Sequence, residues 1–163
     1  MGNLVFCTGT FERSMDGKQR ILLPKSLRLF LAGVDYLFLS PGTDGCIEIH
    51  NEASLGRLAS DSQNSPAAYQ SKTTFSRIFF AQSERCQVDS NHRLRVAGSL
   101  SELAELVSPI VIVGVGNHWE IWNRQNWYGY LSRHQANFDH HAELVRGGSK
   151  DAEIVKEVSN KPR

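Results

Sequence analysis

The chain has 163 residues, 40% of them apolar, and a formal net charge of +1 at pH 7. This length suits one medium domain or two small ones, and the composition is that of a soluble protein able to bury a sizeable core. The lack of any stretch of 18 uncharged apolar residues argues against a membrane helix, and three cysteines without a CxxC pair favour a reducing compartment. We therefore expect a cytoplasmic protein.

Strands and one short helix are predicted within residues 5–50. Residues 5–13 have the pattern of a strand, 16–19 of a turn and 20–23 of a returning strand. The segment PKSLRLFLAG predicts a helix, because Pro24 lies near its first turn and Gly33 just past its last. The segments YLFLS and GCIEIH, separated by PGTDG, predict a hairpin with a glycine-containing loop.

This N-terminal segment is basic although the chain as a whole is nearly neutral. Residues 1–30 hold five basic side chains against two acidic ones, a local charge of +3. The basic residues are Arg13, Lys18, Arg20, Lys25 and Arg28, and the acidic ones are Glu12 and Asp16. Such a local excess is compatible with a polyanionic partner that the overall charge would not suggest.

A helical linker is predicted over residues 55–82. In SPAAYQSKTTFSRIFFAQSE, Ser65 suits the N-cap and Pro66 the first helical position. Tyr69, Ile78 and Phe79 then fall on one stripe of the helix.

The pattern of the N-terminal segment returns after the linker. RCQVD, SNH and RLRVA predict strand, turn and strand, and in SLSELAELV the residues Ser99 and Glu102 have the spacing of a capping box. PIVIVGVGNHWEIW supplies two strands. The first, IVIVGV, is apolar throughout and does not alternate with polar residues, so we expect it to be buried on both faces at the centre of the core. A helix and a frayed, charged tail are expected over residues 127–163.

Two sets of matches indicate an internal duplication. Asp16 and Arg20 recur as Asp89 and Arg93 at an offset of 73 residues, and the segment CIEIHN recurs as HWEIWN at an offset of 72. Each copy has roughly 45 residues, a size that seldom sustains its own core. We therefore expect the two copies to pack together as one unit.

The repeated motif DxxxR can fix both a turn and an arginine at a hairpin. An aspartate at the start of a turn accepts backbone hydrogen bonds, and it can also orient the following arginine through a charge-assisted bond. An arginine held in this way presents planar donors that suit phosphate oxygens or the acceptor edge of guanine. The competing interpretation is an ordinary exposed Asp–Arg turn, which contributes little stability.

The segments MDGKQRILLPKSLR, SERCQVDSNHRLRVAGSL and VIVGVGNHWEIWNRQNWYGYL resemble the MraZ family, in which two SpoVT-AbrB-type domains are joined in one chain. The resemblance covers approximately residues 5–131 and includes both DxxxR motifs. It implies an α+β fold of tandem swapped-hairpin AbrB-like β-barrel modules that form one pseudo-symmetric unit, with linking and C-terminal helices. The modules would span residues 9–54 and 83–126.

The resemblance also implies a function. Family members are expected to be transcriptional repressors that bind tandem repeats in double-stranded promoter DNA upstream of their own division and cell-wall operon. They are expected to act as ring-like homo-oligomers in the cytoplasm, associated with the nucleoid. Catalysis, a cofactor, a metal, a membrane and a small-molecule ligand are not expected.

The basic positions that recur in the wider AbrB-type family fall on Arg13, Arg20 and Arg28 in the first copy. Their equivalents in the second copy are Cys86, Arg93 and Ser101, so only one position there remains basic. We therefore assign the DNA-binding face to the first copy, with Lys18 as an additional phosphate ligand. Arg93 is expected either to orient the fold or to contact a neighbouring subunit, and Asp16 and Asp89 to orient the two turns.

Two departures from the family pattern stand out. In the second copy, Gly98 occupies a position where the family typically has proline, and in both copies the glycine that usually precedes the motif arginine is replaced. This chain has Gln19 and His92 there. Either these residues adopt a positive φ, at a cost of about 1 kcal/mol or more, or Gly17 and Asn91 carry the unusual conformation instead.

The chain's polar and aromatic residues suggest three other uses. Cys86, Asp89 and His92 could form a nucleophile, orienting group and base, but alternation along the predicted strand favours a packed cysteine. Three histidines at 134, 140 and 141 could bind a metal, although a solvated helix is the better interpretation. Trp119, Trp122 and Trp127 could stack on bases, but a strand over residues 118–122 would place Trp119 and Trp122 on opposite faces, so at least one belongs to the core or an interface.

The alternative function on the same fold is a non-catalytic, ring-forming scaffold or antitoxin-like assembly module. Such a module needs no DNA, and the charge of the first copy discriminates against it only weakly. Salt-dependent binding to promoter DNA separates the two functions, because affinity that comes from phosphate neutralisation falls steeply with salt.

Overall fold

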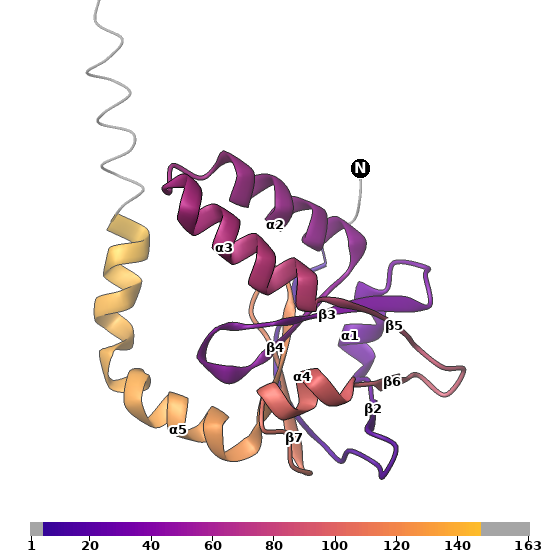
Figure 1. Ribbon diagram of the computed structural model, residues 1–163. Helices are drawn as coiled ribbons and strands as arrows, with labels where there is room; N and C mark the ends of the chain where they lie inside the picture. The colour runs from indigo at the N-terminus through magenta and orange to yellow at the C-terminus, as the bar shows by residue number, and fades with distance from the viewer. Residues whose placement is uncertain (1–4, 148–163) are drawn as a thin grey trace, which may run out of the picture. The chain divides into compact units, whose positions relative to one another are not determined.

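The computed structural model describes residues 5–147 and divides the chain into two compact units at Trp127. The first unit has a mixed α+β fold that contains both repeats and the linker between them (Figure 1). The first repeat comprises β1 (Thr10–Arg13), β2 (Arg20–Leu22), α1 (Lys25–Phe30), β3 (Tyr36–Pro41), η1 (Thr43–Gly45) and β4 (Ile47–His50). The linker comprises α2 (Glu52–Asn64), α3 (Tyr69–Phe79) and η2 (Phe80–Gln82). The second repeat comprises β5 (Glu84–Gln87), β6 (Arg93–Arg95), α4 (Gly98–Leu103), β7 (Ile110–Gly114) and β8 (Trp119–Asn123).

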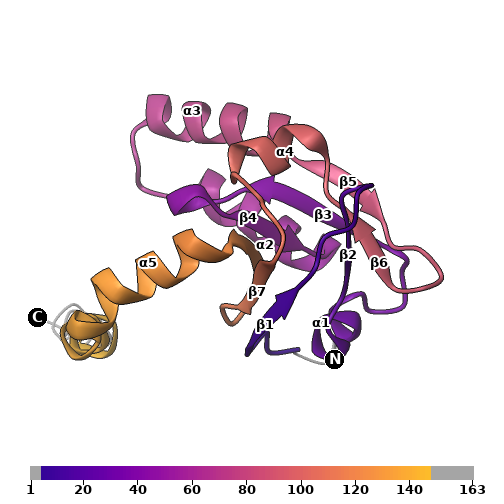
Figure 2. The ribbon, with the colours of Figure 1, turned by 90° about the horizontal axis from the view of Figure 1, so that it is seen from below.

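The two repeats exchange strands. A six-stranded antiparallel sheet has the order β1-β7-β8-β4-β3-β5, and β2 and β6 form a separate antiparallel pair. The first strand of each repeat therefore pairs with the third strand of the other repeat. Figure 2 shows β1 beside β7, with α1 and α4 on opposite sides of the strands. Neither repeat could form this sheet from its own strands alone.

The strand register has an approximate two-fold symmetry. In the pairing of β4 with β8, Glu48 lies opposite Glu120, which is its counterpart in the other repeat. In the pairing of β2 with β6, Ile21 lies opposite Leu94, which are again counterparts. A pseudo-two-fold axis thus passes between the two members of each of these pairs. The duplication inferred from the sequence corresponds to this symmetry.

One apolar core is shared by the two repeats. Ile21, Leu23 and Leu27 from the first repeat and Leu94 and Ile112 from the second are all fully buried in it. Residues 110–113 are buried, as the apolar sequence of β7 predicts, although β7 lies second in the sheet, between β1 and β8. The core therefore joins the repeats into a single folding unit.

Two details of the elements predicted within the repeats are wrong. The strand predicted over residues 5–13 begins only at Thr10, because Gly9 has a φ of +104° and interrupts the extended chain. The capping box of Ser99 and Glu102 does not form, and Ser99 Oγ instead donates to Glu84 Oε1 at 3.2 Å. A tertiary contact thus replaces the predicted local one.

The linker contains two helices and not one. Asn51 caps α2, since its Oδ1 accepts from Ser54 N at 2.9 Å and Ser54 Oγ accepts from Asn51 N at 3.1 Å. The predicted N-cap, Ser65, follows the end of α2 instead. Of the predicted stripe on α3, Phe79 is buried, but Tyr69 and Ile78 are exposed.

The second unit begins within α5 (Arg124–His134), at Tyr128, and continues through η3 (Gln135–Asn137) into a further helical stretch over residues 138–147. The charged tail for which fraying was predicted begins at residue 147, and all of it beyond that residue, 148–163, lies outside the described residues. Over residues 5–147, every helix is too short or too polar to cross a membrane.

Candidate nucleic-acid interface

The first DxxxR motif forms a tightly bonded turn between β1 and β2. Asp16 Oδ1 accepts the backbone N–H of Lys18 at 2.9 Å and of Arg20 at 3.0 Å. Asp16 Oδ2 accepts from Arg20 Nε at 2.8 Å and lies 2.7 Å from Arg20 Nη2. One carboxylate therefore fixes the backbone of the turn and the direction of the arginine, as the sequence predicts.

The second motif repeats this geometry between β5 and β6. Asp89 Oδ1 accepts the backbone N–H of Asn91 and of Arg93, each at 2.9 Å, and Asp89 Oδ2 accepts from Arg93 Nε at 2.9 Å. The two turns are thus built alike, and any functional difference between them comes from the side chains around each turn.

The residue before each motif arginine adopts the left-handed conformation. Gln19 has a φ of 59° and His92 a φ of 58°, whereas Gly17 and Asn91 do not have positive φ. Hydrogen bonds between the repeats hold these residues: the Gln19 carbonyl accepts from Val96 N at 2.9 Å, and the His92 carbonyl accepts from Leu23 N at 3.0 Å. Of the two possibilities left open by the sequence, positive φ at Gln19 and His92 is the correct one.

Both motif aspartates are held in the charged form. The side-chain hydrogen bond from Arg20, followed by the Arg20 backbone N–H, lowers the pKa of Asp16 to about 2. The pKa of Asp89 is also lowered, chiefly by the backbone N–H of Arg93 and then by its side chain. The guanidinium is thus the largest cause of the lowered pKa at Asp16, whereas the backbone N–H is the largest cause at Asp89.

The four predicted DNA ligands do not converge on one point. Lys18 is exposed at the turn, next to Arg20. Arg13 is half-buried on β1, where its Nη1 donates to the Glu12 carbonyl at 2.8 Å. Arg28 is half-buried on α1, where its Nε donates to the Leu23 carbonyl at 3.1 Å.

A surface hollow of about 470 Å³ gathers part of this set with a residue that the sequence analysis missed. It is lined by Gly17, Lys18, Gln19, Arg20 and Arg95. Arg95 belongs to the second repeat and lies opposite Arg20 in the pairing of β2 with β6. The alternating RLR of β6 places Arg93 and Arg95 on the same face of the strand, and this was the only sequence signal that could have identified Arg95.

The competing sites find no support in the geometry. Burial, followed by the charge of Glu84, raises the pKa of the Cys86 thiol to about 11, so the thiol is protonated at neutral pH, and Cys86 packs against the core as predicted. Trp119 and Trp122 are both buried and cannot stack on bases. Within residues 5–147, no cluster of three or more His, Cys, Asp or Glu side chains is placed to hold a metal.

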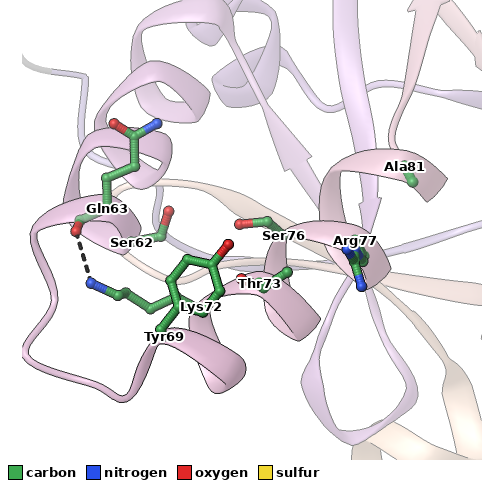
Figure 3. A pocket seen from close by; sticks show the side chains of 8 residues that line it. All are labelled: Ser62, Gln63, Tyr69, Lys72, Thr73, Ser76, Arg77 and Ala81. Atoms are coloured by element: carbon green, nitrogen blue, oxygen red, sulfur yellow. Dashed lines mark hydrogen bonds between the residues drawn. The ribbon is translucent and has the colours of Figure 1, made fainter.

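A second hollow, of about 570 Å³, lies between the linker helices α2 and α3 (Figure 3). Lys72 Nζ donates there to the carbonyls of Gln63 and Ser65, each at 3.3 Å, and so ties α3 to the end of α2. Lys72 thus stabilises the packing of the two linker helices, and we assign no ligand to this hollow.

Comparisons with known proteins cover both repeats. Residues 79–145 match the family model described as "MraZ protein, putative antitoxin-like". A protein of Lactiplantibacillus plantarum named transcriptional regulator MraZ is 31% identical over 135 residues, which are 83% of this chain and 94% of the relative. A relative of the same name from Saccharopolyspora erythraea is 31% identical over 140 residues, which are 86% of this chain and 96% of the relative. Another, from Halothermothrix orenii, is 29% identical over 131 residues, which are 80% of this chain and 90% of the relative.

Proposed function

The chain belongs to the MraZ family, whose curated relatives are named transcriptional regulators, and from this premise we propose that it is a sequence-specific DNA-binding repressor. Its target is double-stranded promoter DNA, in tandem repeats upstream of its own division and cell-wall operon. It acts in the cytoplasm, at the nucleoid.

The proposal includes the finer architecture expected from the family. Residues 9–54 and 83–126 are two AbrB-like modules that exchange hairpins to make one pseudo-symmetric barrel, joined by the linker 55–82 and followed by the segment 127–163. The pairing of β1 with β7 and of β5 with β3 supports this assignment, because each module completes the sheet of the other.

The observation that carries the function is the locked turn of Asp16 and Arg20. The ion pair uses Nε and Nη2 of Arg20, whereas Nη1 has no hydrogen-bond partner within residues 5–147. An arginine fixed in this way needs little further ordering to donate to a guanine edge in the major groove. We assign base reading to Arg20.

Phosphate binding is assigned to the other basic residues of the first repeat. Lys18 is exposed at the turn, and Arg13 and Arg28 each use one nitrogen on a carbonyl of their own chain, which holds the guanidinium in place. Since Asn91, Cys86 and Ser101 are their counterparts, the second turn lacks these cations. Arg93 is therefore assigned to the fold or to a contact between subunits.

A single turn of this size offers a small contact. A ring-like homo-oligomer would present several such turns to successive operator repeats, and the resulting avidity can exceed a single-site affinity by about two to four orders of magnitude. Repression then follows from covering the promoter.

Two variants test the assignment of faces. Arg20→Ala is expected to abolish binding to the promoter in a fluorescence anisotropy titration while the oligomer keeps its size in light scattering. Arg93→Ala is the matched control, because the same atoms are removed from the equivalent turn, and it is expected to weaken binding much less. A larger loss with Arg93→Ala would reverse the assignment, and binding that does not change with salt would favour the scaffold function.

A further inference from the structure

Arg95 lies at the first turn although it belongs to the second repeat. The pairing of β2 with β6 places it directly opposite Arg20, and both line the hollow beside Lys18. Like charges opposite each other across a strand pair are destabilising. Asp16 neutralises Arg20, but neither Lys18 nor Arg95 forms an ion pair within residues 5–147. The hollow therefore holds two uncompensated positive charges.

The pseudo-symmetry shows that the fold does not require these charges. The offset of 73 residues relates Lys18 to Asn91 and Arg95 to Leu22. The equivalent place at the second turn therefore carries an amide and a leucine that is 46% exposed. The backbone and the Asp–Arg pair are the same at both turns, so the two cations at the first turn serve something other than folding.

We propose that Lys18 and Arg95 together bind one backbone phosphate of duplex DNA in this hollow, next to the base contact of Arg20. The inference deepens the proposed function and rests on it. An ammonium and a planar guanidinium can each donate to a different non-bridging oxygen of one phosphodiester. The DNA-binding site is then composite, with the second repeat supplying part of the contact made by the first.

This assignment predicts a defined binding signature for Arg95→Gln. Because a phosphate contact carries no base information, affinity should fall by the same factor, roughly tenfold, for the promoter duplex and for a scrambled duplex of equal length. The slope of log affinity against log salt, measured between about 50 and 200 mM, should become shallower by about one unit. Arg95→Lys keeps the charge and should stay close to the wild type.

Fluorescence anisotropy on the full-length chain, with both duplexes, tests these expectations. Arg57→Gln is the matched control, since Arg57 is also an exposed arginine but lies on helix α2, outside the hollow. Its replacement should leave the affinity for DNA nearly unchanged. Lys18→Gln gives an independent measure of the same site, and it remains informative if Arg95→Gln lowers the melting temperature. The double variant Lys18→Gln/Arg95→Gln should lose less than the product of the single losses, because both residues hold one phosphate.

Each outcome decides the question. Sequence-independent loss with a shallower salt slope and non-additive single variants supports the composite phosphate site. Unchanged affinity of Arg95→Gln, a loss confined to the promoter duplex, or strictly multiplicative losses would overturn it while leaving the proposed function intact. Failure of the wild type to bind the promoter duplex at low salt would overturn the proposed function, and this inference with it.

Discussion

At the scale of single residues, the two motif aspartates differ in what holds their charge. The Arg20 side chain is the largest influence on Asp16, whereas the Arg93 backbone N–H is the largest influence on Asp89. The folded-state pKa of Asp16 is lowered from 3.8 to about 2, so its contribution to stability is complete above pH 3.8 and is lost as the pH falls toward 2.

Removing each guanidinium should change the pKa values of the two aspartates by different amounts. Arg20→Gln is expected to raise the pKa of Asp16 toward its ordinary value, because the main cause of the shift is gone. Arg93→Gln should raise the pKa of Asp89 by less, because the largest cause of its lowered pKa is the backbone N–H of residue 93, which the substitution leaves in place. Carboxyl ¹³C chemical shifts followed through an acid titration measure both values, and a larger rise at Asp89 than at Asp16 would contradict this ranking.

At the scale of elements, two glycines have opposite roles. A Cβ on Gly114 would overlap the backbone of Cys7 and Thr8, where the N-terminal segment crosses β7 and Gly114 N donates to the Gly9 carbonyl at 2.9 Å. Gly56 lies in α2 with open space around it. Gly114 therefore permits a close approach of two segments, whereas Gly56 only adds flexibility to a helix.

The same substitution should have opposite effects at these two sites. Gly114→Ala is expected to lower the free energy of unfolding by about 2 kcal/mol, because β1 and β7 must separate. Gly56→Ala is expected to raise it by about 1 kcal/mol, because alanine favours the helix. Urea denaturation followed by circular dichroism measures both, and equal signs for the two changes would contradict this reading of the contacts.

Element prediction from the sequence succeeded where local patterns decide and failed where tertiary contacts do. The apolar run of β7 and the hairpin of β3 and β4 were identified, since burial and turn residues leave a local signal. Helix α2 was missed as a separate element, because its start depends on the single cap Asn51 directly after a strand. The Ser99 cap was predicted wrongly because Glu84, distant in sequence, takes its hydroxyl.

At the scale of the first unit, the exchange of strands makes the repeats interdependent. A chain cut in the connection between α2 and α3 should give fragments 1–66 and 67–163, neither of which is a folded monomer alone, because each lacks the partner strands of its sheet. An equimolar mixture should recover a cooperative thermal transition in circular dichroism and a single species in size exclusion. A fragment that melts cooperatively as a monomer would contradict this interdependence.

The candidate site was predictable only in part for the same reason. Asp16, Lys18 and Arg20 are neighbours in sequence, so the turn and its charge could be inferred from the motif. Arg95 reaches the turn through the register between β2 and β6, which is a relation between the repeats that no local pattern encodes. Sequence reasoning thus identified the half of the site that one repeat supplies.

Footprinting of the wild-type protein on the DNA upstream of its own transcription unit tests the central claim most directly. The account predicts protection of two or more evenly spaced short repeats at low ionic strength, with protection lost as salt is raised. Uniform cleavage across that region at low ionic strength, with the protein intact and assembled, would contradict it.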